Sequence, residues 1–190
     1  LLTEMANLTA DVSHSEVVEA WLSAVLNQSP AEQTKNNSDD IGAFLVRLLE
    51  QRRNGLVKLF VTLLGLRMRR HLPELFTAGS YFPLETKGTF ADRIIAFARQ
   101  HEGRLMLVVA PRLTVKVVGL GGPPPLGEVW GDTSVVLSNS LLAENHTAWE
   151  LRELFSRDTW SLDKGPLDST TTLRVADILR TFPIAMAFSH

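Results

Sequence analysis

The chain has 190 residues, a formal net charge of −2, 45% hydrophobic residues and 21% charged residues. This length suits one large domain or a small domain with an appendage, and the composition excludes disorder over the whole chain. No apolar run approaches the ~20 residues that cross a bilayer. The near-neutral net charge argues against a general nucleic-acid binder. The absence of cysteine excludes disulfides and thiolate chemistry.

The chain begins at Leu1 without an initiator methionine, and no basic-then-apolar signal segment follows. We therefore expect a piece of a longer polypeptide. Such a piece need not have an activity of its own. The lack of cysteine and the mildly acidic composition fit a cytoplasmic location.

The N-terminal region has helical periodicity. After a cap at Ser13 or Ser15, the apolar residues of 17–26 recur at spacings of three and four, which predicts an amphipathic helix. The segment 28–40 is polar and contains Pro30, so we predict an exposed loop there.

Two further helices are predicted after this loop. Asp39 or Asp40 is the expected cap of a helix that ends before Gly55, with arginines in its last turn. The apolar spacing of 56–71 predicts the next helix, and Pro73 ends it.

Beyond about residue 72 the pattern changes to short apolar segments separated by turn residues, which is typical of an antiparallel β-domain. His101, Glu102 and Gly103 form a candidate hairpin turn. We predict a proline-containing loop over 119–127 and a short helix over 175–180. The predicted strands are 81–87, 93–98, 104–110, 114–118, 133–137 and 184–188.

Few motifs indicate chemistry. The glycines of 119–122 lack the spacing of a dinucleotide fingerprint and no helix opens after them, so a surface turn is predicted. The five histidines show no metal-ligand spacing and there is no G-x-S-x-G motif. We expect no metal, no cofactor and no catalytic residue. The loop carboxylates are interpreted as solvated or turn-capping groups; they are Asp132, Asp158, Asp163 and Asp168.

Two groups of side chains have a binding interpretation beside a structural one. The aromatic residues of the β-part could stack on sugar rings, although core positions are more common for them; they are Tyr81, Trp130, Trp149 and Trp160. Trp130, Asp132 and Tyr81 are the candidate substrate-binding residues. The arginines near the helix ends could meet an acidic partner or a phosphate, although a solvated helix face is the simpler interpretation; they are Arg52, Arg53, Arg67, Arg69 and Arg70.

Seven short sequence segments occur in a characteristic order along the chain. The most specific of them is the end of the predicted helix, Arg69-Arg70-His71-Leu72-Pro73-Glu74-Leu75-Phe76, which is followed by a turn with Gly79 and Tyr81. The segments are 55–62, 66–76, 79–85, 95–99, 108–113, 130–133 and 182–185. Together they resemble the C-terminal end of maltooligosyl trehalose synthases, which belong to the α-amylase superfamily (glycoside hydrolase family 13-like).

This resemblance implies an α+β fold with two parts. Residues 1–77 would contain the closing helices of a (β/α)8 catalytic barrel, and residues 78–190 would form an antiparallel C-terminal β-sandwich. The family converts the reducing-end α-1,4 linkage of a maltooligosaccharide into an α,α-1,1 trehalosyl linkage. Its catalytic carboxylates stand on barrel strands that would precede Leu1, so no catalytic residue carries over.

Three hypotheses follow. The first is a structural, inactive tail whose partners are the rest of its barrel and, in the full-length enzyme, a maltooligosaccharide, with no nucleic acid and no membrane. The second is an α-glucan-binding module that uses the aromatic residues. The third is an interaction module in which the apolar helix faces form a homodimer.

Overall fold

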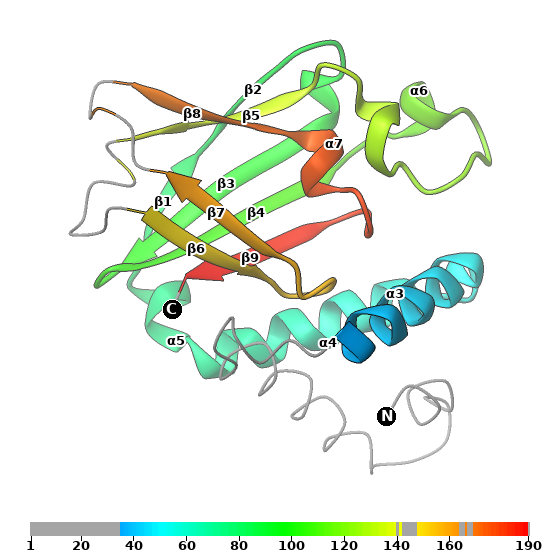
Figure 1. The fold of residues 1–190 in the computed structure, drawn as a ribbon, viewed down its shortest axis with the longest axis horizontal. Coiled ribbons are helices and arrows are strands. Elements are labelled where there is room, and N and C mark those ends of the chain that lie inside the picture. The colour runs from blue at the N-terminus through cyan, green and yellow to red at the C-terminus, as the bar shows by residue number, and fades with distance from the viewer. Residues whose placement is uncertain (1–34, 140, 142–147, 164–165, 167–168, 190) are drawn as a thin grey trace.

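The computed structural model describes residues 35–139, 141, 148–163, 166 and 169–189, which form three layers (Figure 1). A helical layer covers one face of a six-stranded sheet, and a three-stranded sheet covers the other face. All strand pairings are antiparallel. The fold is therefore α+β, as predicted. The predicted helix over 17–26 lies outside the described residues.

The helical layer follows the predicted order. Its elements are α3 (Lys35–Glu50), the 3₁₀ turn η2 (Arg52–Asn54), α4 (Leu56–His71) and α5 (Pro73–Thr77). Gly55 has a φ of 85°, a left-handed conformation that glycine adopts at no steric cost, and it reverses the chain between α3 and α4. None of the helices within the described residues is both long and apolar enough to cross a bilayer.

The helix α3 begins earlier than the sequence predicts. Residues 35–40 are helical, so the predicted loop over 28–40 is wrong for its last six residues. Polar residues can extend a helix when its later turns are held by packing, and the apolar face of α3 beyond residue 40 is buried. The aspartates that were expected to cap the helix lie inside it.

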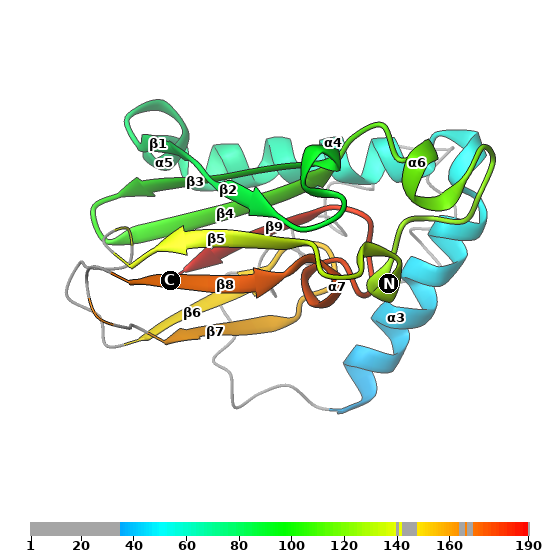
Figure 2. The same cartoon turned by 90° about the horizontal axis from the view of Figure 1, so that it is seen from above.

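The large sheet has the strand order β1-β3-β4-β9-β6-β7, and the small sheet has the order β2-β5-β8 (Figure 2). The strands are β1 (Ser80–Pro83), β2 (Glu85–Lys87), β3 (Ile94–His101), β4 (Arg104–Pro111), β5 (Ser134–Ser138), β6 (Ala148–Glu153), β7 (Thr159–Asp163), β8 (Thr170–Arg174) and β9 (Ala185–Ser189). The predicted β3–β4 hairpin is present, with His101 opposite Arg104. Strands β6, β7 and β8 were not predicted.

Short helical turns connect the strands. They are η3 (Ala91–Arg93), α6 (Val115–Val118), η4 (Gly127–Trp130) and α7 (Val175–Ile178). The predicted strand over 114–118 is wrong, because this segment forms α6. Valine favours strands only where a neighbouring ladder exists, and a φ of 49° at Leu113 turns the chain away from the sheet. The predicted loop over 119–127 and the short helix before Pro183 are confirmed.

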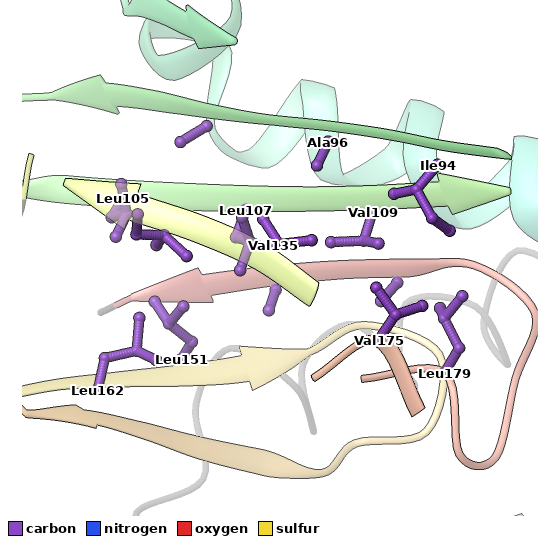
Figure 3. Close-up of a cluster of buried hydrophobic side chains, with 14 of the residues drawn as sticks. Ile94, Ala96, Leu105, Leu107, Val109, Val135, Leu151, Leu162, Val175 and Leu179 are labelled. Carbon is purple, nitrogen blue, oxygen red and sulfur yellow. The ribbon is translucent and has the colours of Figure 1, made fainter. Parts of the chain in front are cut away.

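Two cores lie on opposite faces of the large sheet. The core toward the helices is centred on Phe60 of α4, whose ring centroid lies 5.5 Å from Phe44, 5.9 Å from Phe155 and 5.8 Å from Phe182. The core toward the small sheet is lined by Leu105, Leu107, Val109, Val135 and Leu151, among others (Figure 3). The division at residues 77 and 78 falls between α5 and β1 and stays a prediction.

Candidate functional site

The segment Trp130-Gly131-Asp132-Thr133 joins two loops. Asp132 Oδ1 accepts a hydrogen bond from the Thr89 backbone N–H at 2.8 Å, and Thr133 Oγ1 accepts one from the Phe90 N–H at 3.1 Å. These bonds hold the turn after β2 against the turn before β5. We call residues 88–91 and 130–133 the two-loop clasp.

Close backbone contact explains two features of the two-loop clasp. Gly88 has a φ of 97°, and a Cβ there would lie 2.6 Å from the Asp132 carbonyl oxygen, so only glycine fits. The hydrogen bond from the Thr89 N–H is the main cause that lowers the pKa of the exposed Asp132 carboxyl below its usual value. Asp132 therefore favours the ionised form that accepts this bond.

Trp130 is an internal residue of the two-loop clasp. Its side chain has no exposed surface, and its indole N–H donates to the Pro125 carbonyl oxygen at 2.9 Å. The Phe90 ring meets it edge-on at 6.3 Å. A ring that is enclosed in this way offers no free face for a sugar, and its contacts are those of a core aromatic residue.

Tyr81 lies elsewhere, on the edge strand β1. Its side chain is 55% exposed, and its ring centroid lies 5.2 Å from that of Phe97. The structure thus places Trp130 and Asp132 in one clasp, whereas Tyr81 pairs with Arg99 in the other sheet. No contact described in the structure joins Tyr81 to the clasp, and sugar binding by these three residues stays a prediction.

Glu153 is a buried carboxylate that the sequence did not single out. It ends β6, is 2% exposed, and accepts three backbone hydrogen bonds. Its Oε2 accepts the N–H groups of Phe155, at 2.7 Å, and Ser156, and its Oε1 accepts the Met186 N–H at 3.0 Å. One side chain therefore ties the β6–β7 turn to β9.

The position of Glu153 follows from where the β6–β9 ladder stops. The Leu154 N–H donates to the Met186 carbonyl at 2.9 Å, and a regular antiparallel pair would return a bond from the Met186 N–H to Leu154. The chain turns away at this point, and the Glu153 carboxylate takes the place of the missing carbonyl. A carboxylate placed between the apolar residues Leu151 and Leu154 is the one sequence signal that could have indicated it.

Burial raises the pKa of Glu153 to about 7, and the three N–H donors offset part of that effect. Charged groups border the turn. Burial also lowers the pKa values of Arg152 and Arg157, and Asp158 pairs with Arg180 at 3.7 Å. Both oxygens of Glu153 are occupied by backbone donors, so its chemistry is that of a structural acceptor.

Other candidate groups are not brought together by the described part of the chain. Asp132 lies in the two-loop clasp and Asp158 in the β6–β7 turn, whereas the side chains of Asp163 and Asp168 lie outside the described residues. No three described histidine, aspartate or glutamate side chains are placed to hold a metal ion. The glycines of 119–122 form a surface turn after α6.

The outer face of the helical layer carries exposed apolar side chains. Val46 of α3 is 56% exposed, and Leu59 and Leu66 of α4 are 45% and 57% exposed. The opposite faces of the same helices are fully packed on the large sheet, through Leu45 and Leu64 among others. Helices with apolar residues on both faces usually lie between two bodies.

The comparisons with known proteins are limited. No protein-family model matches the chain, and no curated protein matches it. A search of solved structures finds a noncanonic maltogenic alpha-amylase, AmyB from Thermotoga neapolitana, with 20% identity and a TM-score of 0.38. The match covers 62% of this chain and 22% of that enzyme, so the chain spans less than a quarter of its length. A similarity at this level does not establish a shared family.

Proposed function

We propose that the chain is the non-catalytic C-terminal part of a cytoplasmic maltooligosyl trehalose synthase. The sequence segments that resemble this family support the proposal, and the order of helices followed by a β-sandwich agrees with it. The observation that carries it is the set of exposed apolar side chains on the outer face of α3 and α4, Val46, Leu59 and Leu66. In the proposed enzyme this face packs on the rest of the catalytic barrel.

The full-length enzyme would move the reducing-end glucose of a maltooligosaccharide from an α-1,4 to an α,α-1,1 linkage within the same molecule. Such chemistry needs a carboxylate nucleophile and a second carboxylic acid close to the scissile bond. In the proposed enzyme the barrel that precedes this chain supplies that pair. The chain's own role is to support the barrel, and its two packed cores make it a rigid base for that role.

Two tests examine this proposal. The reading frame that precedes Leu1 is expected to encode barrel strands that end in the acidic catalytic residues. An unrelated domain directly ahead of Leu1 would contradict the proposal. The chain alone is also expected to leave the reducing ends of maltopentaose unchanged, and a non-reducing trehalosyl product formed by it would refute the non-catalytic role.

The same helical face favours a second candidate function, that of a dimerisation module. A separate chain could cover Val46, Leu59 and Leu66 with a second copy of itself. Light scattering would then report a dimer that Leu59→Asp with Leu66→Asp converts to a monomer. A wild-type chain that stays monomeric at high concentration rejects this alternative.

A further inference from the structure

One end of the molecule gathers positive charge. The junction of α3 and α4 lies there beside the lobe formed by residues 112–122, which includes α6 (Figures 1 and 2). A hydrogen bond of 3.3 Å from Arg52 Nη2 to the Gly122 carbonyl oxygen joins the two segments. Six exposed cations lie on them: Arg47, Arg52, Arg53, Lys58, Arg112 and Lys116. We call this surface the cationic end.

These charges are not neutralised within the described part of the chain. No ion pair there involves any of the six cations. Glu50 is the single carboxylate of residues 46–58 and 112–122. Asp92 and Glu128 pair with arginines outside this surface, Arg93 and Arg174, at 2.8 Å and 3.0 Å. In a chain of net charge −2, this end therefore carries a local excess of positive charge.

Apolar side chains project from the same lobe. Leu113 is 63% exposed, Val115 is 55% exposed and Leu120 is 91% exposed. The lobe has a defined shape, because Leu113 holds a φ of 49° and a Cβ at Gly122 would lie 2.0 Å from the Val118 carbonyl oxygen. Exposed leucines among cations on a firmly shaped lobe are typical of a contact surface.

We propose that the cationic end is a docking surface for an acidic protein segment in which leucines lie among the carboxylates. Carboxylates of the segment would face the six cations, and its leucines would pack on Leu113 and Leu120. The surface includes no aromatic residue, whereas membrane-interface and single-strand nucleic-acid sites rely on aromatic rings. This composition favours a protein. The proposal is independent of the function proposed above.

A binding titration tests the proposal. The probe is a fluorescent peptide of glutamate, leucine and glycine, and a peptide with glutamine in place of glutamate is its neutral counterpart. The wild-type chain is expected to bind the acidic peptide and not to bind the neutral one. Its affinity for the acidic peptide should fall as salt is added. The triple variant Arg52→Glu, Arg53→Glu, Arg112→Glu should bind the acidic peptide at least about tenfold more weakly.

A matched control changes the net charge equally at the opposite end of the molecule. It carries Arg69→Glu, Arg70→Glu and Arg104→Glu, three exposed positions, and should bind like the wild type. The double variant Leu113→Ser, Leu120→Ser should bind about fivefold more weakly with an unchanged salt dependence, because only apolar contact is lost.

Three results would overturn the proposal. One is equal weakening in the control variant, which would mean a general charge effect. Another is unchanged binding by the leucine double variant, which would leave only non-specific attraction. The last is tighter binding to vesicles of phosphatidylserine and phosphatidylcholine, or to a DNA duplex, than to the acidic peptide.

Discussion

At the scale of single residues, Glu153 provides an acceptor that the backbone of β6 does not. Its carboxylate bonds to Met186 across the sheet and to two N–H groups of its own turn. Asp132 and Thr133 do the same between two loops on the other side of the molecule. In each case a polar side chain satisfies backbone donors where regular structure ends.

The first prediction concerns the pH dependence of stability. The folded pKa of Glu153 is raised from 4.5 to about 7, so the folded state holds a proton that the unfolded state has already released. This stabilising contribution is complete below pH 4.5 and is lost as the pH rises through about 7. As the pH rises over this range, the unfolding free energy of the wild type should fall by up to about 3 kcal/mol relative to that of Glu153→Gln.

Urea unfolding at a series of pH values measures this difference. Glu150 is exposed on the same strand, so Glu150→Gln is the control. The difference in unfolding free energy between this control and the wild type should stay nearly constant across the pH series. A wild-type difference from Glu153→Gln that does not change with pH would contradict the prediction.

The second prediction concerns Trp130. Because its side chain is fully enclosed and its N–H is bonded to Pro125, Trp130→Ala should lower the unfolding free energy by about 3–5 kcal/mol. Tyr81→Ala, at a half-exposed position, should cost less than about 1 kcal/mol. Chemical denaturation measures both. A Trp130→Ala protein of wild-type stability that had lost affinity for maltopentaose would instead support a sugar-binding role.

At the scale of elements, one arginine attaches α5 to the sheet. Arg99 of β3 donates from Nε to the Leu75 carbonyl and from Nη2 to the Gly79 carbonyl, both at 2.9 Å. These carbonyls lie within and just after α5, where helical acceptors have no helical partner. The forked guanidinium reaches both at once.

The third prediction follows from this fork. Arg99→Lys keeps the charge but can reach only one carbonyl, so it should cost about 1–2 kcal/mol. Hydrogen exchange should accelerate at Ala78 and Gly79, whose N–H groups close the end of α5 on the Glu74 carbonyl. Arg104→Ala, on the exposed end of the adjacent hairpin, serves as the control. Unchanged exchange in Arg99→Lys would show that α5 is held by its apolar contacts alone.

The elements also show what sequence could and could not predict. Helix α4 and the β3–β4 hairpin were predictable because their signals, apolar periodicity and turn residues, are local. Residues 115–118 look like a strand locally, but they form the helix α6 and belong to neither sheet. Trp130 and Asp132 are close to each other in sequence. The loop at Thr89, to which Asp132 is bonded, is far from them in sequence, so this pairing is not visible in a local pattern. Glu153 was missed because one of its donors, Met186, lies 33 residues away.

At the scale of the whole molecule, the helical layer and the large sheet share one core. Phe60 of α4 contacts Phe44 of α3, and it also contacts Phe155 and Phe182, which lie in turns of the β-part. Met106 and Val108 of β4 belong to the same core and fill the space beneath the helices. The helices therefore stabilise the sheet and depend on it in turn.

The fourth prediction is that this unit unfolds in one step. Far-UV ellipticity, dominated by helices, and the fluorescence of Trp130, Trp149 and Trp160 in the β-part should change at the same denaturant concentration. Phe60→Ala should shift both signals together and cost about 3–5 kcal/mol. The exposed variant Leu59→Ala, its neighbour, should change stability little. Helical signal that disappears in a separate, earlier transition would contradict a shared core.

Strand β4 illustrates a consequence of being enclosed on both sides. Leu105, Leu107 and Val109 face one core, and Met106 and Val108 face the other. Sliding this strand by one residue would exchange its apolar side chains between cores without exposing them to water, so hydrophobicity alone does not fix its alignment. The tight turn at Glu102 and Gly103, both with positive φ, sets it instead. A residue inserted in that turn would therefore shift the register of β4 against β3, whereas most substitutions in the core would leave this register unchanged.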